Sequence, residues 1–173
     1  MLLISIETAI YKHKLDKKLA ESQAKLKDAH DNLELRVQER TAELENAYQE
    51  LSDIYNNAPC GYHSLDKDGY FVKINSTELN WLGYTVDEII GKKKFSEIVT
   101  EESAKKFEKN YPGFLERGFV YDLEFDMIKK DGSIITVLVN ATAIYDADKN
   151  FLMSRSTLFD ISNRKKRYEN NSK

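Results

Sequence analysis

Apolar side chains in the first third of the chain recur at alternating spacings of four and three residues. The repeat runs through Leu15, Leu19, Ser22, Leu26, Ala29, Leu33, Val37, Arg40, Leu44, Ala47, Leu51 and Ile54. Such a repeat is typical of a coiled-coil helix, whose apolar seam faces a partner helix. The spacing shifts once, between Leu33 and Val37, and a four-residue step of this kind locally unwinds the supercoil without ending the helix.

This stretch also lacks the residues that usually end helices, since all seven glycines and both prolines lie at Pro59 or beyond. We therefore expect a helix over residues 1–55, with a seam on the order of 60 to 75 Å long. One small domain cannot bury so long a stripe, so the simplest partner is the same helix of a second chain. A helix packed on its own domain is the alternative. Weak seam residues allow a signal-responsive pairing as well as a stiff rod: Ser22, Ala29, Arg40 and Ala47.

Short alternating segments replace the heptad pattern from Asn56 onward. The patterns predict strands at 62–66 and 70–74, helices at 75–82, 85–90 and 100–117 with a disturbance at Pro112-Gly113, and strands at 119–127, 133–145 and 151–161. In the third strand Phe119, Tyr121, Leu123, Phe125 and Met127 alternate with acidic residues, which predicts one buried and one wet face. This order predicts an α+β fold, with a five-stranded antiparallel sheet and short helices on one face.

Several motifs in this region occur in a fixed order: Gly61–Asn75, Leu79–Tyr84, Glu88–Gly91, Lys130–Gly132 and Phe159–Arg164. Over about residues 53 to 164 the sequence resembles the PAS family of sensor domains. The segment Leu35–Leu44 is similar to the coiled-coil linkers beside such domains in bacterial sensor histidine kinases and cyclic-dinucleotide enzymes. The resemblance implies a coiled-coil helix at 1–55, a PAS sensor domain at 56–162 and a C-terminal output linker at 163–173.

The resemblance also implies a function. A PAS domain between two helices is expected to be a non-catalytic signal-input module of a bacterial two-component or phosphorelay system. It would sense a stimulus or small ligand, act as a homodimer through the N-terminal helix, and relay the signal to a downstream signalling domain or kinase. The alternative is a PAS interaction or dimerisation module without a small-molecule ligand, which a small, dry cavity would favour.

By the same resemblance, a pocket between the sheet and the helices is the expected ligand site. The candidate lining residues are Trp81, Phe95, Phe107, Tyr111, Phe125, Val137, Val139 and His63, and the alternative for each is a plain core position. Asp160 and Ser162, at the end of the last strand, are the candidate signal-relay residues. Their alternative role is to cap the following helix.

The family's cofactor motifs are missing from the sequence. No Gly-x-Asn-Cys-Arg pattern for a flavin adduct occurs near Phe95, and residues 100–117 contain no histidine to bind haem. Cys60 and His63 have a suggestive spacing, but two soft ligands do not make a metal site. His30 lacks the proline and spacing of a kinase phosphoacceptor box. No nucleophile and base pair, metal cluster or nucleotide loop predicts an enzyme.

Net charge and cysteine content indicate which classes of partner and which cellular compartment to expect. A net charge of -3 gives no general attraction to nucleic acid or anionic lipid. No apolar run approaches the roughly 18 residues that cross a bilayer. Met1–Ile10 is too short for a signal peptide, is interrupted by Glu7, and has neither a basic leader nor a small-residue cleavage site after it. The single Cys60 cannot form an internal disulfide. We therefore expect a cytoplasmic chain.

Overall fold

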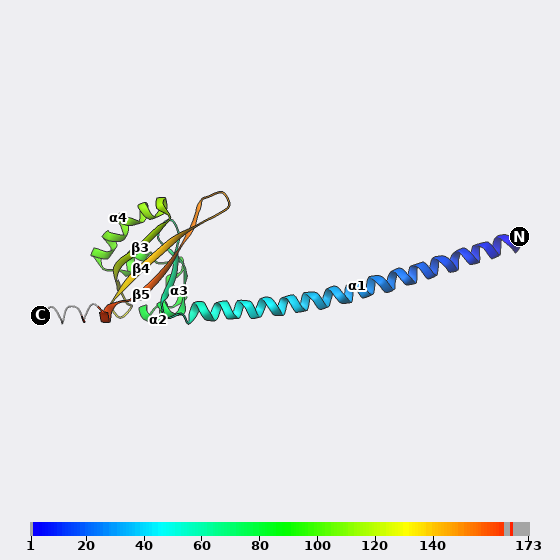
Figure 1. Ribbon diagram of the computed structural model, residues 1–173, viewed down its shortest axis with the longest axis horizontal. Helices are drawn as coiled ribbons and strands as arrows, with labels where there is room; N and C mark the ends of the chain where they lie inside the picture. Colours follow the sequence, from blue (N-terminus) through cyan, green and yellow to red (C-terminus); the bar gives the residue numbers. More distant parts are fainter. Residues whose placement is uncertain (1, 165–166, 168–173) are drawn as a thin grey trace. The chain divides into compact units, whose positions relative to one another are not determined.

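The computed structural model describes residues 2–164 and 167, with side chains from Ile10 onward (Figure 1). It divides into two compact units, Met1–Leu51 and Ser52–Lys173. The predicted long helix is present as α1, Leu2–Asn56. Its apolar seam residues are between 55% and 72% exposed in the single chain: Leu15, Leu19, Leu26, Leu33, Val37, Leu44, Leu51 and Ile54. No helix in the described part of the chain combines the length and apolar character needed to cross a bilayer.

The second unit contains the predicted α+β fold. Its five antiparallel strands lie in the order β2-β1-β5-β4-β3: β1 Gly61–Leu65, β2 Phe71–Ile74, β3 Phe119–Ile128, β4 Ile134–Tyr145 and β5 Phe151–Asp160. Four short helices connect β2 to β3 and cover one face of the sheet: α2 Ser76–Leu82, α3 Val86–Ile89, the 3-10 helix η1 Phe95–Ile98 and α4 Glu101–Arg117 (Figure 1).

The core lies between the sheet and these helices. Its fully buried apolar side chains come from every layer, and they include Phe71, Leu82, Ile89, Phe95, Ile98, Met127, Val137 and Leu158. Helix α2, predicted at 75–82, begins one residue later, at Ser76, and ends at Leu82 as predicted. Asn75 is its N-cap, and Gly83 ends it with a φ of 75°, a left-handed conformation that glycine adopts without a steric penalty.

Helix α4 corrects the prediction of a disturbance at Pro112-Gly113, because the helix continues through both residues. Pro112 lacks the N–H that would bind the Glu108 carbonyl. Pro112 and Glu108 are both exposed, so water can donate to the Glu108 carbonyl in place of the missing N–H. The proline is tolerated because the lost hydrogen bond lies on the solvent side.

Strand β3 corrects the prediction of a single buried face. The pairing with β4 shifts register between Val120 and Leu123, and Asp122 in the bulge has a φ of 55°. The bulge reverses the faces of the residues before it. Phe119 and Tyr121 are therefore 48% and 60% exposed, whereas Val120 turns toward the core side.

Candidate functional site

A cavity of about 40 Å³ lies between the inner face of the sheet and α4. Strands β1, β3, β4 and β5 supply one wall, and η1 and α4 supply the other. The wall is almost entirely apolar, and its aromatic part consists of Phe95, Phe107, Tyr111, Phe114 and Phe125. The polar groups at the cavity are few: His63, Asn110, Ser154 and Ser156.

The aromatic side chains pack as one continuous cluster. Phe95 stands edge-on to Phe125, with ring centroids 5.2 Å apart, and its centroid lies 5.0 Å from that of Phe107. Phe107 and Tyr111 stack at 4.6 Å, one helical turn apart on α4. The Tyr111 hydroxyl donates to the Asp66 carbonyl. Burial, and then the charge of Asp66, raises the pKa of Tyr111, so its hydroxyl remains a neutral donor.

A buried acid–base pair forms the polar end of the cavity. His63 Nδ1 lies 2.8 Å from Glu78 Oε1, and the two side chains are 2% and 0% exposed. The His63 ring stands edge-on to Phe71 at 5.0 Å. Glu78 Oε2 is buried without a hydrogen-bond partner among the described residues. Because a buried polar atom without a partner is costly, this oxygen is the least satisfied atom of the site.

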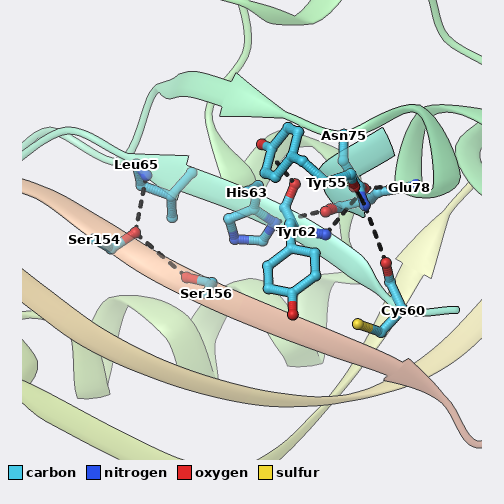
Figure 2. Close-up of polar contacts among 9 residues, drawn as sticks. All are labelled: Tyr55, Cys60, Tyr62, His63, Leu65, Asn75, Glu78, Ser154 and Ser156. Atoms are coloured by element: carbon cyan, nitrogen blue, oxygen red, sulfur yellow. Dashed lines mark hydrogen bonds and ion pairs between the residues drawn. The ribbon is translucent and has the colours of Figure 1, made fainter. Parts of the chain in front are cut away.

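Two serines on β5 complete this end of the cavity. Ser156 pairs directly with His63 across the antiparallel β1–β5 ladder, so both side chains are on the same face of the sheet. Ser154 Oγ accepts a hydrogen bond of 2.8 Å from the Leu65 N–H and lies 3.3 Å from Ser156 Oγ. Figure 2 shows this arrangement, with the Glu78 contact and the two serines on different sides of the imidazole.

Next to this pair, the side chain of Asn75 joins four segments of the chain (Figure 2). Its Oδ1 accepts from the N–H groups of Tyr62 and Glu78, at 2.9 and 3.0 Å. Its Nδ2 donates to the carbonyls of Tyr55 and Cys60, at 2.9 and 3.0 Å. All four hydrogen-bonding positions of this fully buried amide are thus used. The last turn of α1 is fixed to β1 and α2 through one side chain.

The pKa of Tyr55, in that last turn, is affected by the charge of the buried pair. Desolvation by burial, and then the negative charge of Glu78, raises the pKa of Tyr55 to about 12. Its ring lies 5.8 Å from that of Tyr62 on β1. The end of α1 therefore contacts the same few residues as the polar end of the cavity.

The structure brings most of the predicted lining residues together. Six of them line this cavity: His63, Phe95, Phe107, Tyr111, Phe125 and Val139. Val137 is fully buried on β4 away from the cavity, and Trp81 on α2 lines a separate surface depression beside Lys129 and Asp131. Ligand contact by the other six stays a prediction.

The two candidate relay residues lie where β5 ends. The Ser162 N–H donates to Asp160 Oδ1 at 2.9 Å, and Ser162 Oγ accepts from the Thr136 N–H at 3.0 Å. These two hydrogen bonds fix the residues that follow β5 to strand β4. Of the output linker at 163–173, only residues 163, 164 and 167 are described, so most of that prediction lies outside the described residues.

Several residues of the site are missing from the sequence-based prediction. Ser154 and Ser156 alternate with less buried positions and share a face with buried Leu158, and this period of two was the signal that could have found them. Val120 enters the cavity only because of the bulge in β3. Nothing in a single sequence indicates that Glu78, in the first turn of a short helix, is buried against His63.

Neither haem nor a flavin fits this site. Pockets for drug-sized ligands measure roughly 300–1,000 Å³, well above the cavity of about 40 Å³. The part of the chain that the structure describes contains no group of three or more His, Cys, Asp or Glu side chains able to hold a metal ion.

Comparison with known proteins identifies one family for most of this chain. The sequence profile of the family described as "PAS domain" matches residues 59–163. A sensor kinase, CckA of Brucella abortus (strain 2308), is 32% identical over 107 residues. That match covers 58% of this chain and 11% of the relative, so the chain spans about a tenth of the relative's length.

Solved structures share the fold. The PAS domain of an HTR-like protein from Haloarcula marismortui superposes with a TM-score of 0.59 at 23% identity, covering 72% of this chain and 99% of that domain. A PAS domain from Colwellia psychrerythraea gives 0.60 at 16% identity, covering 68% and 98%. The PAS-B domain of Drosophila melanogaster Cycle, solved with bound ethylene glycol, gives 0.54 at 16% identity, covering 58% and 98%.

Proposed function

The chain belongs to the PAS domain family, and from that membership we propose that it is the cytoplasmic, non-catalytic signal-input part of a two-component or phosphorelay system. In this proposal two copies pair through α1, and the state of the cavity alters that pairing. A downstream kinase or other signalling domain reads the change.

One observation carries the proposal: the Asn75 amide bonds the last turn of α1 to β1 and α2. The same residues border the polar end of the cavity, since Glu78 follows Asn75 by three positions and contacts His63. A small displacement of His63 or Glu78 therefore reaches the end of α1 through two hydrogen-bonded contacts. A bias of a few kcal/mol between two packings is enough for such a relay.

The exposed seam of α1 supports pairing between two copies. A row of leucines this long, left uncovered on a single chain, is unfavourable in water and favours association. Sensor kinase CckA, which resembles the PAS region, supports a bacterial signalling context.

Hydrogen exchange of the full chain tests the relay. We expect a small molecule that enters the cavity to change amide exchange both in β1 and in residues 45–56 of α1. Exchange that changes at the cavity while residues 45–56 remain as before would contradict a signal-input role.

The small cavity favours a second candidate function, an interaction module that senses no ligand. Native mass spectrometry and an absorbance spectrum of the freshly purified chain distinguish the two. A dimer without any retained molecule, whose α1 is insensitive to every cavity probe, would establish the interaction module instead.

A further inference from the structure

The buried His63–Glu78 pair contains one ring nitrogen that no protein group uses. Nδ1 is bound to Glu78, and no described residue bonds Nε2. His63 is only 3% exposed, yet it lines the cavity, as does its cross-strand neighbour Ser156. A ring nitrogen on a buried side chain that lines a cavity, with no partner among the described residues, is a hydrogen-bonding position left for a ligand.

The protonation of the pair determines whether His63 Nε2 is a hydrogen-bond donor or an acceptor. If His63 is cationic and Glu78 ionised, both ring nitrogens carry hydrogen. If the proton shared by the pair is bound to Glu78 instead, the Glu78 carboxyl donates a hydrogen bond to Nδ1. The neutral ring then carries its own hydrogen on Nε2. In both electrically neutral arrangements, therefore, Nε2 is a donor.

Only one arrangement makes Nε2 an acceptor: a neutral ring with its hydrogen on Nδ1, facing an ionised Glu78. That arrangement leaves a net negative charge in the core. Among the residues that the structure describes, none is a hydrogen-bond partner of Glu78 Oε2, and no lysine or arginine lines the cavity. Because an uncompensated buried charge costs several kcal/mol, the site disfavours this state.

We infer that the cavity takes a small, uncharged molecule with an apolar body and a hydrogen-bond acceptor, such as a ketone, aldehyde or amide. His63 Nε2 donates to the acceptor, and the Ser156 hydroxyl is the second group within reach. Two other donor groups on the wall already have acceptors, because the Tyr111 hydroxyl is bound to the Asp66 carbonyl and Asn110 Nδ2 is bound to the Lys106 carbonyl. A charged ligand is excluded because it would lose its hydration in a cavity whose wall is almost entirely apolar and contains no lysine or arginine. This inference rests on the proposed signal-input function, and it names the ligand class of that site.

The size of the ligand follows from the cavity. A water molecule needs about 10–15 Å³ of such space, so about 40 Å³ accommodates a few non-hydrogen atoms. The aromatic wall, from Phe95 to Phe125, contacts the apolar body of the ligand.

The first test is the ¹⁵N NMR spectrum of the full chain with labelled histidine. We expect the Nε2 of His63 to show the chemical shift of a nitrogen that carries hydrogen, with the resonance assigned by its loss in a His63→Phe/Glu78→Gln variant. The shift of a bare, pyridine-like nitrogen would overturn the inference.

The second test compares three probes with equal numbers of non-hydrogen atoms: butan-2-one, 2-methylbut-1-ene and propanoate. In methyl-detected NMR titrations of the full chain, we expect butan-2-one to bind about tenfold more tightly than the alkene, the value of one net hydrogen bond. Propanoate should shift none of the cavity methyl groups of Leu65 and Val139. Equal affinity for ketone and alkene, no binding of the ketone, or preferred binding of the anion would each overturn the inference.

The His63→Phe/Glu78→Gln variant should bind the ketone and the alkene about equally, because it removes the donor and the buried charge together. The matched control is His30→Phe, the same replacement on the exposed surface of α1, which should keep the preference. A preference that survives in the double variant counts against His63 as donor. Failure of the proposed function is distinguishable, because it appears as an unchanged α1 in hydrogen exchange even when butan-2-one binds.

Discussion

The side-chain amide of Asn75 donates to the carbonyl of Tyr55 across 2.9 Å, and so fixes the last turn of the long helix to the sensor domain. Tyr55 is followed by Asn56, whose side chain accepts from the Ser76 N–H at 3.1 Å. The carbonyl of Asn56 accepts from Thr77 Oγ1 at the same distance. The start of α2 thus supplies the hydrogen-bond partners for the end of α1.

Replacement of Asn75 by alanine removes four hydrogen bonds, two of them buried and two partly buried, and leaves their partners unsatisfied. We expect Asn75→Ala to lower the free energy of unfolding by about 2–4 kcal/mol, measured by urea denaturation. Amide exchange of residues 54–57 should accelerate more than the global loss of stability explains, because the Tyr55 carbonyl loses its partner.

Asn32→Ala is the matched control for this change. Asn32 Nδ2 makes one exposed hydrogen bond of 2.8 Å, to the Asp28 carbonyl within α1. Its replacement should change stability by less than about 0.5 kcal/mol. Similar losses for the two variants would mean that the Asn75 network has no special role.

The buried pair gives a second prediction. Glu78→Leu leaves His63 without its partner and should cost about 3–5 kcal/mol, whereas the double variant His63→Phe/Glu78→Leu should recover a large part of that loss. Phe71 and Phe95 already pack against His63 and can accommodate a phenyl ring. Thermal and urea denaturation of the single and double variants give the coupling free energy. Additive losses would show that the two side chains do not interact.

Gly61 provides a steric test of the same region. A Cβ at this position would lie 3.2 Å from Glu78 Cβ, from Glu78 Oε2 and from Leu158 Cβ. Since none of these atoms can move freely in the core, we expect Gly61→Ala to destabilise the domain by about 1–3 kcal/mol.

Gly113→Ala is the contrasting variant. The nearest atoms to its new Cβ belong to the flexible, exposed side chain of Arg117, and alanine favours a helix over glycine by up to about 1 kcal/mol. This variant should be neutral or stabilising in the same urea experiment. A loss comparable to that of Gly61→Ala would contradict the steric argument.

The sequence predicts the fold more fully than the site, for physical reasons visible in particular residues. Helix caps and turns are local, so Asn75 and Gly83 could be identified from their neighbours alone. The bulge at Asp122 depends on the pairing of β3 with β4, which alternation cannot show, and it decides that Val120 rather than Tyr121 faces inward. The His63–Glu78 contact joins a strand to a helix. Its burial depends on how deeply α2 packs.

The ion pair between Lys130 and Glu88 gives a prediction about pH. The side chain of Lys130, at 2.6 Å, and the Thr85 N–H, at 3.0 Å, lower the pKa of Glu88 from its ordinary value of 4.5 to about 2. A carboxylate with a lowered pKa stabilises the fold above its ordinary value, and this stabilisation disappears as pH falls from about 4.5 to about 2.

Lys130→Met should therefore reduce the difference in urea midpoint between about pH 6 and about pH 3, because Glu88 then titrates nearer its ordinary value. Lys73→Met on β2 removes an equal charge from an exposed strand position and serves as control. If both variants retain the full pH dependence, the Lys130–Glu88 contact does not contribute to it.

The seam of α1 gives the last prediction. Leu44 lies at a seam position and is 71% exposed in the single chain, whereas Ala42 lies on the outer face of the predicted coiled coil. Burial of a leucine contributes about 1.5–3 kcal/mol, and a dimer buries two copies. Leu44→Asp also places two carboxylates opposite each other. Its dimer dissociation constant should rise at least about 100-fold, while Ala42→Asp should leave it nearly unchanged. Sedimentation equilibrium of the full chain measures both, and a Leu44→Asp chain that still dimerises like the wild type would rule out pairing through this seam.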